Sequence, residues 1–460
     1  GWRSTLMESN FIGRYLLFSM ARRNVLALTK GHYPAPLVAL DLIKRTYTKP
    51  LAQGLKEEIS TFIAAIPDEF RNAPNLIHVF FASEEVKKNP DLPPGAQAKK
   101  IESAAVIGAG TMGAGIVWLF TNSDIPVRFK DVSWAAIGKG YGVIRQIYQK
   151  MLKSRKLRSE EMSRKFLLAS GTIDYTGFSH VDLVIEAAAE NLELKKRVFA
   201  ELEEEIPKDA ILATNTSSLT IDSMASSIKH PERFVGMHFF NPPNKMPLVE
   251  VVAGKQTSPN TLATAVELCK RMKKVPIIVK DCPGFLVNRI FAIAANEAGW
   301  MLQEGVTMER LERLITRFGM PMGPFTLSDE VGNDIAYKVF SGFHSAYGER
   351  FLMPKISKEV FDEHFFGKKS GAGYFLYKGK KAEENPEIKK LLQKNSFPKR
   401  DVSDQDVVER FVFGMINEAS RCLEEGVVKN ATHLDIALIY GMGFPPFRGG
   451  LLRYADSIGS

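Results

Sequence analysis

Three glycines at a fixed spacing form a loop that could bind a dinucleotide. Gly108, Gly110 and Gly113 come directly after the apolar run 104–107 and lead into a helical stretch. Gly108 permits the tight turn, Gly110 lets a pyrophosphate approach the backbone, and Gly113 lets the helix pack on the strand. The helix N-terminus then offers free N–H groups to the phosphates. The loop, with Thr111, is therefore a candidate cofactor site; the alternative is a set of ordinary turns.

An acidic residue farther along the chain bears on the choice of cofactor. Asp131 follows a second apolar run, 125–129. It lies about 20 positions after the glycines, where a carboxylate binds the ribose 2′-hydroxyl of NAD. Its charge would repel the 2′-phosphate of NADP, so the sequence favours NAD. Arg128 and Lys130 lie close by, and their positive charges leave NADP as an alternative cofactor.

A histidine and a glutamate both stand where apolar residues belong. His238 lies among apolar neighbours in the segment 236–243, and Glu250 lies inside the apolar run 248–252. The two side chains can satisfy each other, which would hold the imidazole in one tautomer and raise its basicity. Oxidation of an alcohol by NAD needs such a base, because the hydroxyl proton leaves as hydride leaves the carbon. The alternatives are a structural core histidine and a charge on an edge strand.

Two further polar residues accompany this pair. Ser217 follows the apolar run 210–213, and Asn288 follows Pro283. Ser217 could instead cap a helix that begins near Ile221, and Asn288 could be a surface amide. Because Ser217, Asn288, His238 and Glu250 all occur downstream of the glycine loop, we favour a shared catalytic role over these alternatives.

These residues need a sheet to bring them together. From 103 to about 281, strands and helices alternate, which is typical of a mostly parallel, doubly wound α/β sheet. After Pro283 the pattern becomes helical. The expected strands are 103–107, 125–130, 182–188, 210–214, 234–239, 248–252 and 275–280, with helices such as 195–206 and 258–273 between them.

The helical part contains an internal repeat. Residues 296–306 resemble residues 417–427, and Gly319-Met320 recurs as Gly441-Met442. We interpret these as two copies of one helical domain, of which the second is truncated. Before the sheet, residues 1 to about 85 carry apolar side chains at helical spacing.

The composition excludes several classes of protein. The chain has 460 residues, of which 45% are hydrophobic and 25% charged, and no apolar stretch of membrane-spanning length. Its basic residues alternate with acidic residues along helices, and no nucleic-acid-binding motif accompanies the net charge of +9. The positive excess instead suits anionic substrates such as coenzyme A esters. The three cysteines lack a metal spacing and indicate a reducing compartment.

Several segments together resemble the L-3-hydroxyacyl-CoA dehydrogenase family. The resemblance runs from about 101 to 460. Within it, the multifunctional β-oxidation enzymes, such as the alpha subunit of bacterial fatty-acid oxidation complexes, are the most similar group, because of the helical start and the tandem helical domains. The segments are 108–113, 190–195, 215–219, 238–242, 248–250 and 284–289.

The resemblance implies roles for individual residues. His238 would be the general base and Glu250 its partner. Ser217 would bind the 3-hydroxyl near the nicotinamide, and Asn288 would bind substrate oxygen. Tyr454 matches a substrate-contacting position of the family that is less well defined, and the alternative is a packed tyrosine. Lys369 matches a cofactor-contacting position that is likewise less well defined, and the alternative is an ordinary lysine in a turn. The implied NAD-contacting positions are Met112, Asp131, Glu190, Lys195, Asn241 and Lys369.

The expected fold is an α/β Rossmann-type NAD-binding domain followed by all-α tandem dehydrogenase C-terminal domains. The first part resembles the helical tail of a hydratase/isomerase domain whose body is missing, ending in a linker at 85–97. The expected parts are 1–100 for this tail and linker, 101–281 for the NAD-binding domain, 282–380 for the first helical copy, 381–404 for an exposed connection and 405–460 for the second copy.

The resemblance also implies the activity and its setting. The expected reaction is NAD-dependent oxidation of (S)-3-hydroxyacyl-CoA to 3-oxoacyl-CoA in fatty-acid β-oxidation, with no metal. The parent protein would also be an enoyl-CoA hydratase/isomerase, although this chain would not. The expected partners are acyl-CoA and a thiolase subunit, the dehydrogenase part being monomeric and located in the bacterial cytoplasm or else the peroxisomal matrix. The alternatives are a dehydrogenase of another β-hydroxy acid and a silent NAD- and CoA-binding scaffold.

Overall fold

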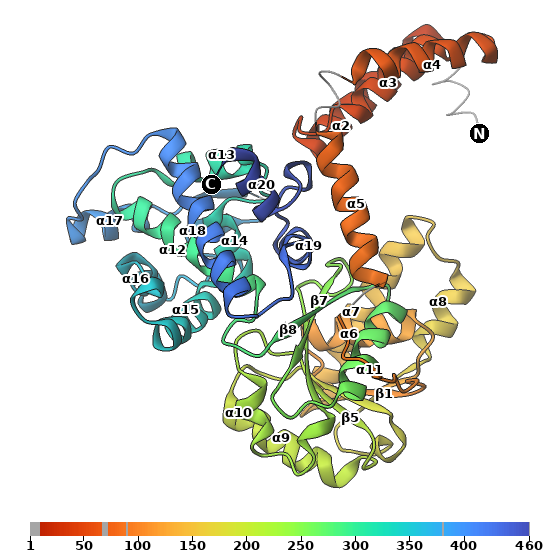
Figure 1. The fold of residues 1–460 in the computed structure, drawn as a ribbon, viewed down its shortest axis with the longest axis vertical. Helices are drawn as coiled ribbons and strands as arrows, with labels where there is room; N and C mark the ends of the chain where they lie inside the picture. The colour runs from red at the N-terminus through yellow and green to blue at the C-terminus, as the bar shows by residue number, and fades with distance from the viewer. Residues whose placement is uncertain (1–9, 67–71, 89–90, 380, 460) are drawn as a thin grey trace. The chain divides into compact units, whose positions relative to one another are not determined.

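One eight-stranded sheet carries His238 and Glu250 in its strands, and several of the other residues singled out above lie in the loops that follow its strands. The computed structural model describes residues 10–66, 72–88, 91–379 and 381–459 (Figure 1). All neighbouring strands run parallel except β6 and β7, as predicted for a mostly parallel sheet. The strand order is β3 (Ala169–Thr172), β2 (Val127–Lys130), β1 (Ala104–Ile107), β4 (Leu183–Glu186), β5 (Ile211–Thr214), β6 (Phe234–Phe239), β7 (Leu248–Ala253) and β8 (Val275–Lys280).

The central strands are apolar because helices cover both faces of the sheet. Every residue of β1, β4 and β5 is buried, as expected for a parallel sheet. On one face pack α6 (Thr111–Asn122), α7 (Trp134–Lys153) and α11 (Pro259–Arg271), which share one apolar core with the strands. Beside α6 and α7 lies α8 (Ser159–Phe166), whose Phe166 packs against the same core. Elsewhere α9 (Leu192–Glu205) sets Phe199 edge-on against Phe234 of β6, and α10 (Ile221–Ala225) lies next to α9.

The edge strand β3 was not predicted. Its sequence, Ala-Ser-Gly-Thr, has low strand propensity and no apolar alternation. Pairing with β2 forms it, and the hydroxyl of Tyr141 accepts a hydrogen bond from the N–H of Gly171 (2.9 Å). A Cβ at Gly171 would lie 2.5 Å from a methyl of Ile137, so only glycine fits there.

The helical part is built around two neighbouring helices, one from each copy of the repeat. α12 (Val287–Gln303) packs along α18 (Asp404–Glu424) (Figure 1). The remaining helices are α13 (Met308–Phe318), α14 (Pro324–Val331), α15 (Asn333–Tyr347), α16 (Lys355–Asp362), α17 (Pro386–Asn395), α19 (Ala431–Met442) and α20 (Leu451–Ile458).

The structure corrects the register of the repeat. α13 ends at Gly319 (φ 125°) and α19 ends at Gly443 (φ 77°), because each chain reversal needs a positive φ. Gly443, not Gly441, is therefore the counterpart of Gly319. Gly441 lies inside α19, where a Cβ would meet Leu248 and Val287.

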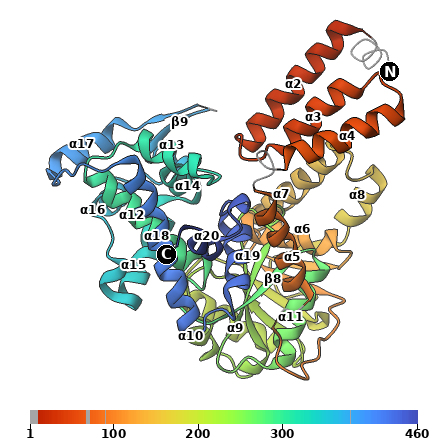
Figure 2. The same ribbon diagram turned by 45° about the horizontal axis from the view of Figure 1, so that its top comes forward.

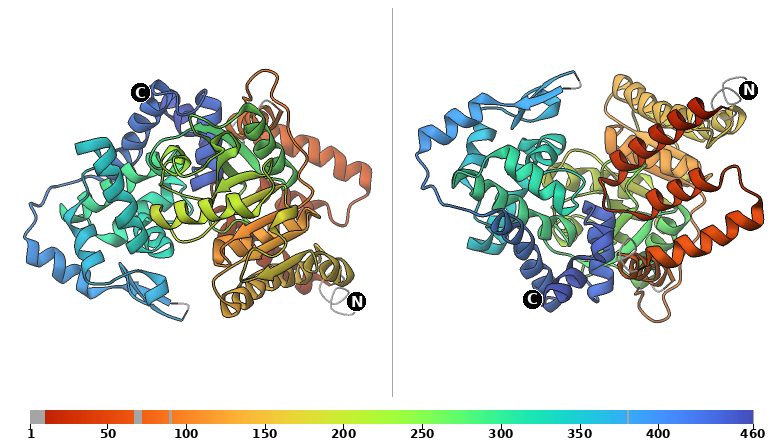
Figure 3. Two further views of the ribbon diagram at one scale, coloured as in Figure 1. Left: turned by 90° about the horizontal axis from the view of Figure 1, so that it is seen from below. Right: turned by 90° about the horizontal axis from the view of Figure 1, so that it is seen from above.

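Two segments expected to be connections are partly regular. The segment 381–404 contains β10 (Lys381–Glu384), which pairs with β9 (Phe375–Lys378), and α17 (Figure 3). Ile388 of α17 is fully buried in the core of the first helical copy, so this segment is not simply exposed. In the expected linker 85–97, helix α5 (Ala73–Lys88) continues to Lys88, and residues 89–90 lie outside the described residues.

The N-terminal helices form a unit of their own. Residues 1–81 with 445–449 make one compact unit, and residues 82–444 with 450–460 make the other. In the first unit α2 (Phe11–Thr29), α3 (Ala35–Thr46) and α4 (Leu51–Ala65) confirm the predicted helical start (Figure 2). Among the described helices, none combines the length and apolarity needed to cross a membrane.

Candidate active site

The antiparallel pair of strands β6 and β7 brings the predicted base to its partner. His238 and Glu250 are directly opposite in the register. The Nδ1 of His238 lies 2.7 Å from Oε2 of Glu250; the glutamate is fully buried and the histidine nearly so. An ionised carboxylate accepts the Nδ1 proton, which leaves Nε2 as the nitrogen that can take a proton. The predicted pair is therefore formed, in the tautomer that a base requires.

The other oxygen of Glu250 ties the sheet to the helical part. Oε1 accepts hydrogen bonds from the N–H groups of Leu286 (3.1 Å) and Val287 (2.9 Å), where α12 begins. A negative charge is stabilised at this position by the helix dipole and the unpaired N–H groups. The carboxylate therefore has its orientation fixed from both sides, and the imidazole orientation follows from it.

Ser217 and Asn288 meet beside this pair. The Nδ2 of Asn288, in the first turn of α12, donates to the backbone oxygen of Ser217 (3.2 Å). Oδ1 of Asn215 accepts from the N–H of Phe239, the residue after His238 (2.8 Å). The loop after β5 is thus attached both to α12 and to the strand of the base. The structure brings all four predicted catalytic residues into one connected group.

Glu190 anchors the same loop. Its Oε1 accepts from the hydroxyl of Thr216 (2.7 Å), the N–H of Ser217 (2.9 Å) and the N–H of Ser218 (3.2 Å). The hydroxyl of Ser217 also lies within 3.3 Å of this oxygen. Burial by itself raises the pKa of Glu190, but the ammonium of Lys195 and these hydrogen bonds outweigh it and hold the pKa below its usual value. Glu190 is therefore a carboxylate at neutral pH.

The glycine loop has the shape that a dinucleotide needs. A Cβ at Gly108 (φ 100°) would lie 2.6 Å from the oxygen of Ala187, and a Cβ at Gly113 would lie 1.9 Å from the oxygen of Gly108. A Cβ at Gly110 would meet no atom within 4 Å, so this position faces open space. α6 begins at exposed Thr111, with Met112 half-buried behind it. The loop fits a pyrophosphate at the helix N-terminus.

Asp131 stands at the end of β2, beside the loop. Its Oδ2 accepts from the N–H of Ala109 (2.7 Å). The two neighbouring cations are directed elsewhere: Arg128 donates to the oxygen of Thr176 (2.8 Å), and Lys130 lies over the ring of Tyr175 (4.5 Å). The charge near the loop is therefore that of the carboxylate, which favours a ribose hydroxyl over a phosphate.

Sequence reasoning missed Glu186, the ion-pair partner of Lys195, while the contact of Lys195 with NAD remains a prediction. Lys195 has no exposed surface, and its Nζ lies 2.8 Å from both oxygens of Glu186 at the end of β4. The signal for Glu186 was present, since it is the one acidic residue in the apolar run Leu-Val-Ile-Glu. Its partner could not be read from the sequence.

The other predicted contact residues remain predictions. Asn241 is exposed in the loop after β6. Lys369, in the short helix Lys368–Ser370, pairs with Asp334 of α15. Tyr454 of α20 packs edge-on against Phe318 of α13 (5.4 Å between centroids). The contacts of Lys369 with Asp334 and of Tyr454 with Phe318 both lie within the helical part.

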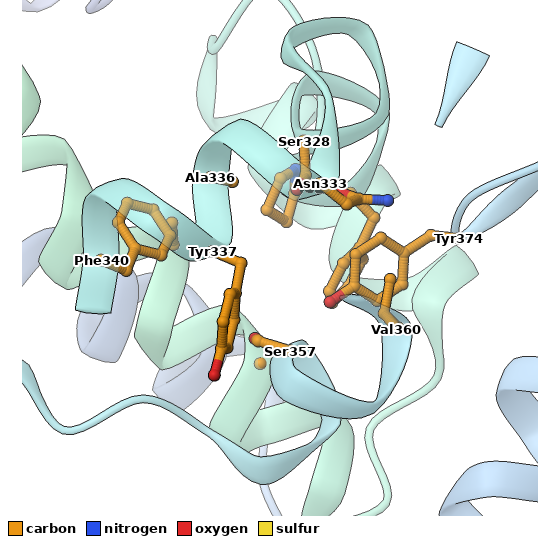
Figure 4. Close-up of a pocket in the computed structure, with 12 residues that line it drawn as sticks. Ser328, Asn333, Ala336, Tyr337, Phe340, Ser357, Val360 and Tyr374 are labelled. Atoms are coloured by element: carbon orange, nitrogen blue, oxygen red, sulfur yellow. Dashed lines mark hydrogen bonds between the residues drawn. The ribbon is translucent and has the colours of Figure 1, made fainter. Parts of the chain in front are cut away.

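A small cavity lies elsewhere, in the first helical copy (Figure 4). It measures about 30 Å³, room for a few waters at most, between α12, α14, α15 and α16. Two of its polar lining residues already have partners within the protein: Ser328 donates to Asn333 (2.6 Å), and Asn333 donates to Asp329 (2.8 Å). We therefore assign no ligand to it.

Comparison with known proteins identifies the family. Residues 103–282 match the NAD-binding domain of 3-hydroxyacyl-CoA dehydrogenase, and residues 284–377 match the C-terminal domain of the same enzyme. The structure of (S)-3-hydroxybutyryl-CoA dehydrogenase from Ralstonia eutropha is 33% identical, with a TM-score of 0.59 over 61% of this chain and all of that one. This chain belongs to the 3-hydroxyacyl-CoA dehydrogenase family. It is an NAD-dependent dehydrogenase, so the predicted family, fold class and cofactor are confirmed.

Two further relatives match this chain over different lengths. 3-Hydroxybutyryl-CoA dehydrogenase from Escherichia coli is 27% identical, with a TM-score of 0.66 over 79% of this chain and 96% of that one. The fatty acid oxidation complex subunit alpha of Shewanella amazonensis is 38% identical over 99% of this chain. The chain spans 64% of the length of that relative.

Proposed function

We propose that this chain oxidises (S)-3-hydroxyacyl-CoA to 3-oxoacyl-CoA with His238 as the general base. The observation that carries the proposal is the His238–Glu250 pair, held at 2.7 Å beside the loop of Ser217 and the first turn of α12. When NAD is bound by the glycine loop, it supplies the hydride acceptor.

The residues of the chain supply the proton chemistry and the orientation. Nε2 of His238 takes the proton of the 3-hydroxyl, and the buried carboxylate of Glu250 stabilises the imidazolium that results. A positioned base of this kind contributes roughly 10²–10⁴-fold to the rate. The hydroxyl of Ser217, which is only loosely held at 3.3 Å from Glu190, can turn to the substrate hydroxyl. The amide of Asn288 would bind a substrate oxygen.

The names of the relatives support a wider setting for this activity. Two bacterial relatives are named as fatty acid oxidation complex subunit alpha, which supports a place in fatty-acid β-oxidation. A hydratase/isomerase part in the parent protein, a thiolase partner and a cytoplasmic location belong to this proposal. The pairing of α12 with α18 inside one chain supports a monomeric dehydrogenase part, which light scattering would check.

The test combines a substrate series with a variant of the base. The protein should reduce NAD with 3-hydroxyacyl-CoA esters and not with free 3-hydroxy acids, and a chain-length series would define its preference. His238→Ala should lower kcat by about 10²–10⁴-fold while NADH binding stays near that of the wild type. Parallel losses in NADH affinity and turnover would indicate a structural histidine, and an inactive wild type that still binds NADH would indicate a scaffold.

A further inference from the structure

One buried lysine outside the catalytic group has no carboxylate partner among the described residues. Lys274, the residue before β8, is 7% exposed. Its ammonium donates to two backbone oxygens, that of Pro243 and that of Met246, the latter at 2.6 Å. Burial lowers the pKa of Lys274 to about 8, so the charge is present at neutral pH at a cost in stability. An apolar side chain would fill this space without that cost, so the two carbonyl groups explain the presence of a lysine.

Both oxygens belong to the loop 240–247, which joins the strand of the base to the strand of its partner. Three of its eight residues are prolines, which have no N–H to donate, so the loop can form few hydrogen bonds of its own. The N–H groups of Lys245 and Met246 both donate to the oxygen of Pro242 (2.9 and 3.1 Å). The ammonium of Lys274 therefore supplies the donors for two further carbonyl groups of this loop.

The same loop lies against the base and against the helix of the glycine loop. The ring of Phe240, its first residue, packs on the ring of His238 (4.4 Å between centroids). Pro243 packs on α6, where a Cβ at Gly115 would lie 3.0 Å from the proline ring. Asn241, a predicted NAD contact, is exposed between Phe240 and Pro243. A shift of this loop would therefore reach both the cofactor site and the base.

We propose that Lys274 is a positioning residue for the cofactor: its ammonium holds the loop 240–247 in the conformation in which Asn241 contacts NAD. Without the ammonium, the carbonyl groups of Pro243 and Met246 lose their donor, and the loop must move to bring them to water. NAD then binds only to the fraction of molecules whose loop has the competent conformation, and its apparent affinity falls by that fraction. This inference deepens the proposed function and rests on the predicted contact of Asn241 with NAD.

The experiment is a double-mutant cycle read by NADH fluorescence titration at pH 7, well below the thermal midpoint of each variant. Lys274→Met removes the donor and should weaken NADH binding about tenfold, which corresponds to a competent loop in about a tenth of the molecules. Asn241→Ala should weaken NADH binding as well. Because Lys274 acts through Asn241, the double variant should bind NADH within about twofold of Asn241→Ala alone.

Lys165→Met is the matched control. Lys165 is also a buried lysine (5% exposed), and its ammonium donates to the oxygen of Asn122 (2.9 Å) and pairs with Asp124 (3.0 Å). These contacts lie at the end of α6 remote from the glycine loop. Lys165→Met should therefore lower the thermal midpoint and leave NADH affinity unchanged, as expected of a lysine with a structural role only.

Three results would overturn the proposal: an unchanged NADH affinity in Lys274→Met, single-variant losses that multiply in the double variant, or an equal loss in Lys165→Met. If Lys274→Met does not fold, Lys274→Gln, which removes the charge and keeps a polar group, replaces it in the cycle with the same expected pattern. NADH binding needs no hydroxyacyl-CoA. A protein that shows this pattern and oxidises no such ester would therefore refute the proposed function and not this inference.

Discussion

At the scale of single residues, the site depends on hydrogen bonds that allow one protonation pattern. Glu250 uses one oxygen for the imidazole of His238 and the other for two N–H groups of α12. It accepts at all of these contacts, so only a carboxylate satisfies them together. An amide in the same place would have to turn its NH₂ toward one of them.

This predicts the effect of Glu250→Gln. The amide oxygen would face the two N–H groups, and the NH₂ would face Nδ1, which must then accept and leave the proton on Nε2. That tautomer cannot take a proton from the substrate. We expect a lower kcat, with a loss smaller than that of His238→Ala, and a pH–rate profile that differs from that of the wild type, because the imidazole has lost its carboxylate partner. A profile identical to that of the wild type would remove Glu250 from the catalytic group.

Asp131 has two tasks that a pair of variants can separate. It repels a 2′-phosphate by its charge, and it supports the glycine loop through the N–H of Ala109. Asp131→Asn keeps an acceptor and removes the charge, so it should narrow the NAD/NADP ratio of kcat/KM with little change in stability. Asp131→Ala removes both and should also weaken NADH binding. A wild-type preference for NADP would refute the charge argument.

At the scale of elements, the contact between β1 and α6 depends on the absence of a side chain at Gly113. The nearest atom to a Cβ there is a backbone oxygen, which cannot move without shifting the turn. Gly138, inside α7, has no atom within 4 Å of its Cβ position and is exposed. The two glycines therefore offer a matched comparison.

Gly113→Ala should lower both the thermal midpoint and the affinity for NADH, because helix and loop must separate. Gly138→Ala should stabilise the protein by about 0.5–1 kcal/mol, since alanine favours a helix and meets no obstacle. Thermal unfolding and NADH titration of both variants check this. Equal effects of the two substitutions would show that the close approach at Gly113 is not required.

At the scale of the whole second unit, one buried arginine joins the two helical copies. Arg289, adjacent to Asn288, donates to Glu418 of α18 (2.6 Å) and to Glu425 just beyond it (2.6 and 2.8 Å). Burial by itself lowers the pKa of Arg289, but these carboxylates outweigh it and raise the pKa, so the guanidinium is always charged. The second copy therefore helps to fix the helix that carries catalytic residues of the first.

Arg289→Met should cost about 3 kcal/mol of stability, because it removes the close partner of the buried carboxylate of Glu418 and leaves it only the more distant guanidinium of Arg350, at 3.5 Å. Arg310 offers the control: it pairs with Asp404 between the same two copies but is partly exposed. Arg310→Met should cost at most about 1 kcal/mol. Urea unfolding of both variants measures the two losses of stability. Similar losses would mean that burial does not make the ion pairs of Arg289 more important for stability than that of Arg310.

The sequence by itself determined the features that depend on local order along the chain. The glycine spacing, the apolar runs and the placement of His238 and Glu250 inside two such runs follow from residue types and near neighbours, and they predicted the cofactor loop, seven of the eight strands of the sheet and the candidate base.

What only the tertiary structure decided are the partners across strands. The register of β6 and β7 sets His238 opposite Glu250, and the neighbouring positions of β4, β5 and α9 bury Lys195 between Glu186 and Glu190. The strand β3 and the burial of Ile388 in α17 likewise come from neighbours distant in the sequence. A charge has a defined role only when its counter-charge is in place, and strand order and register, which no local pattern encodes, decide which charges meet.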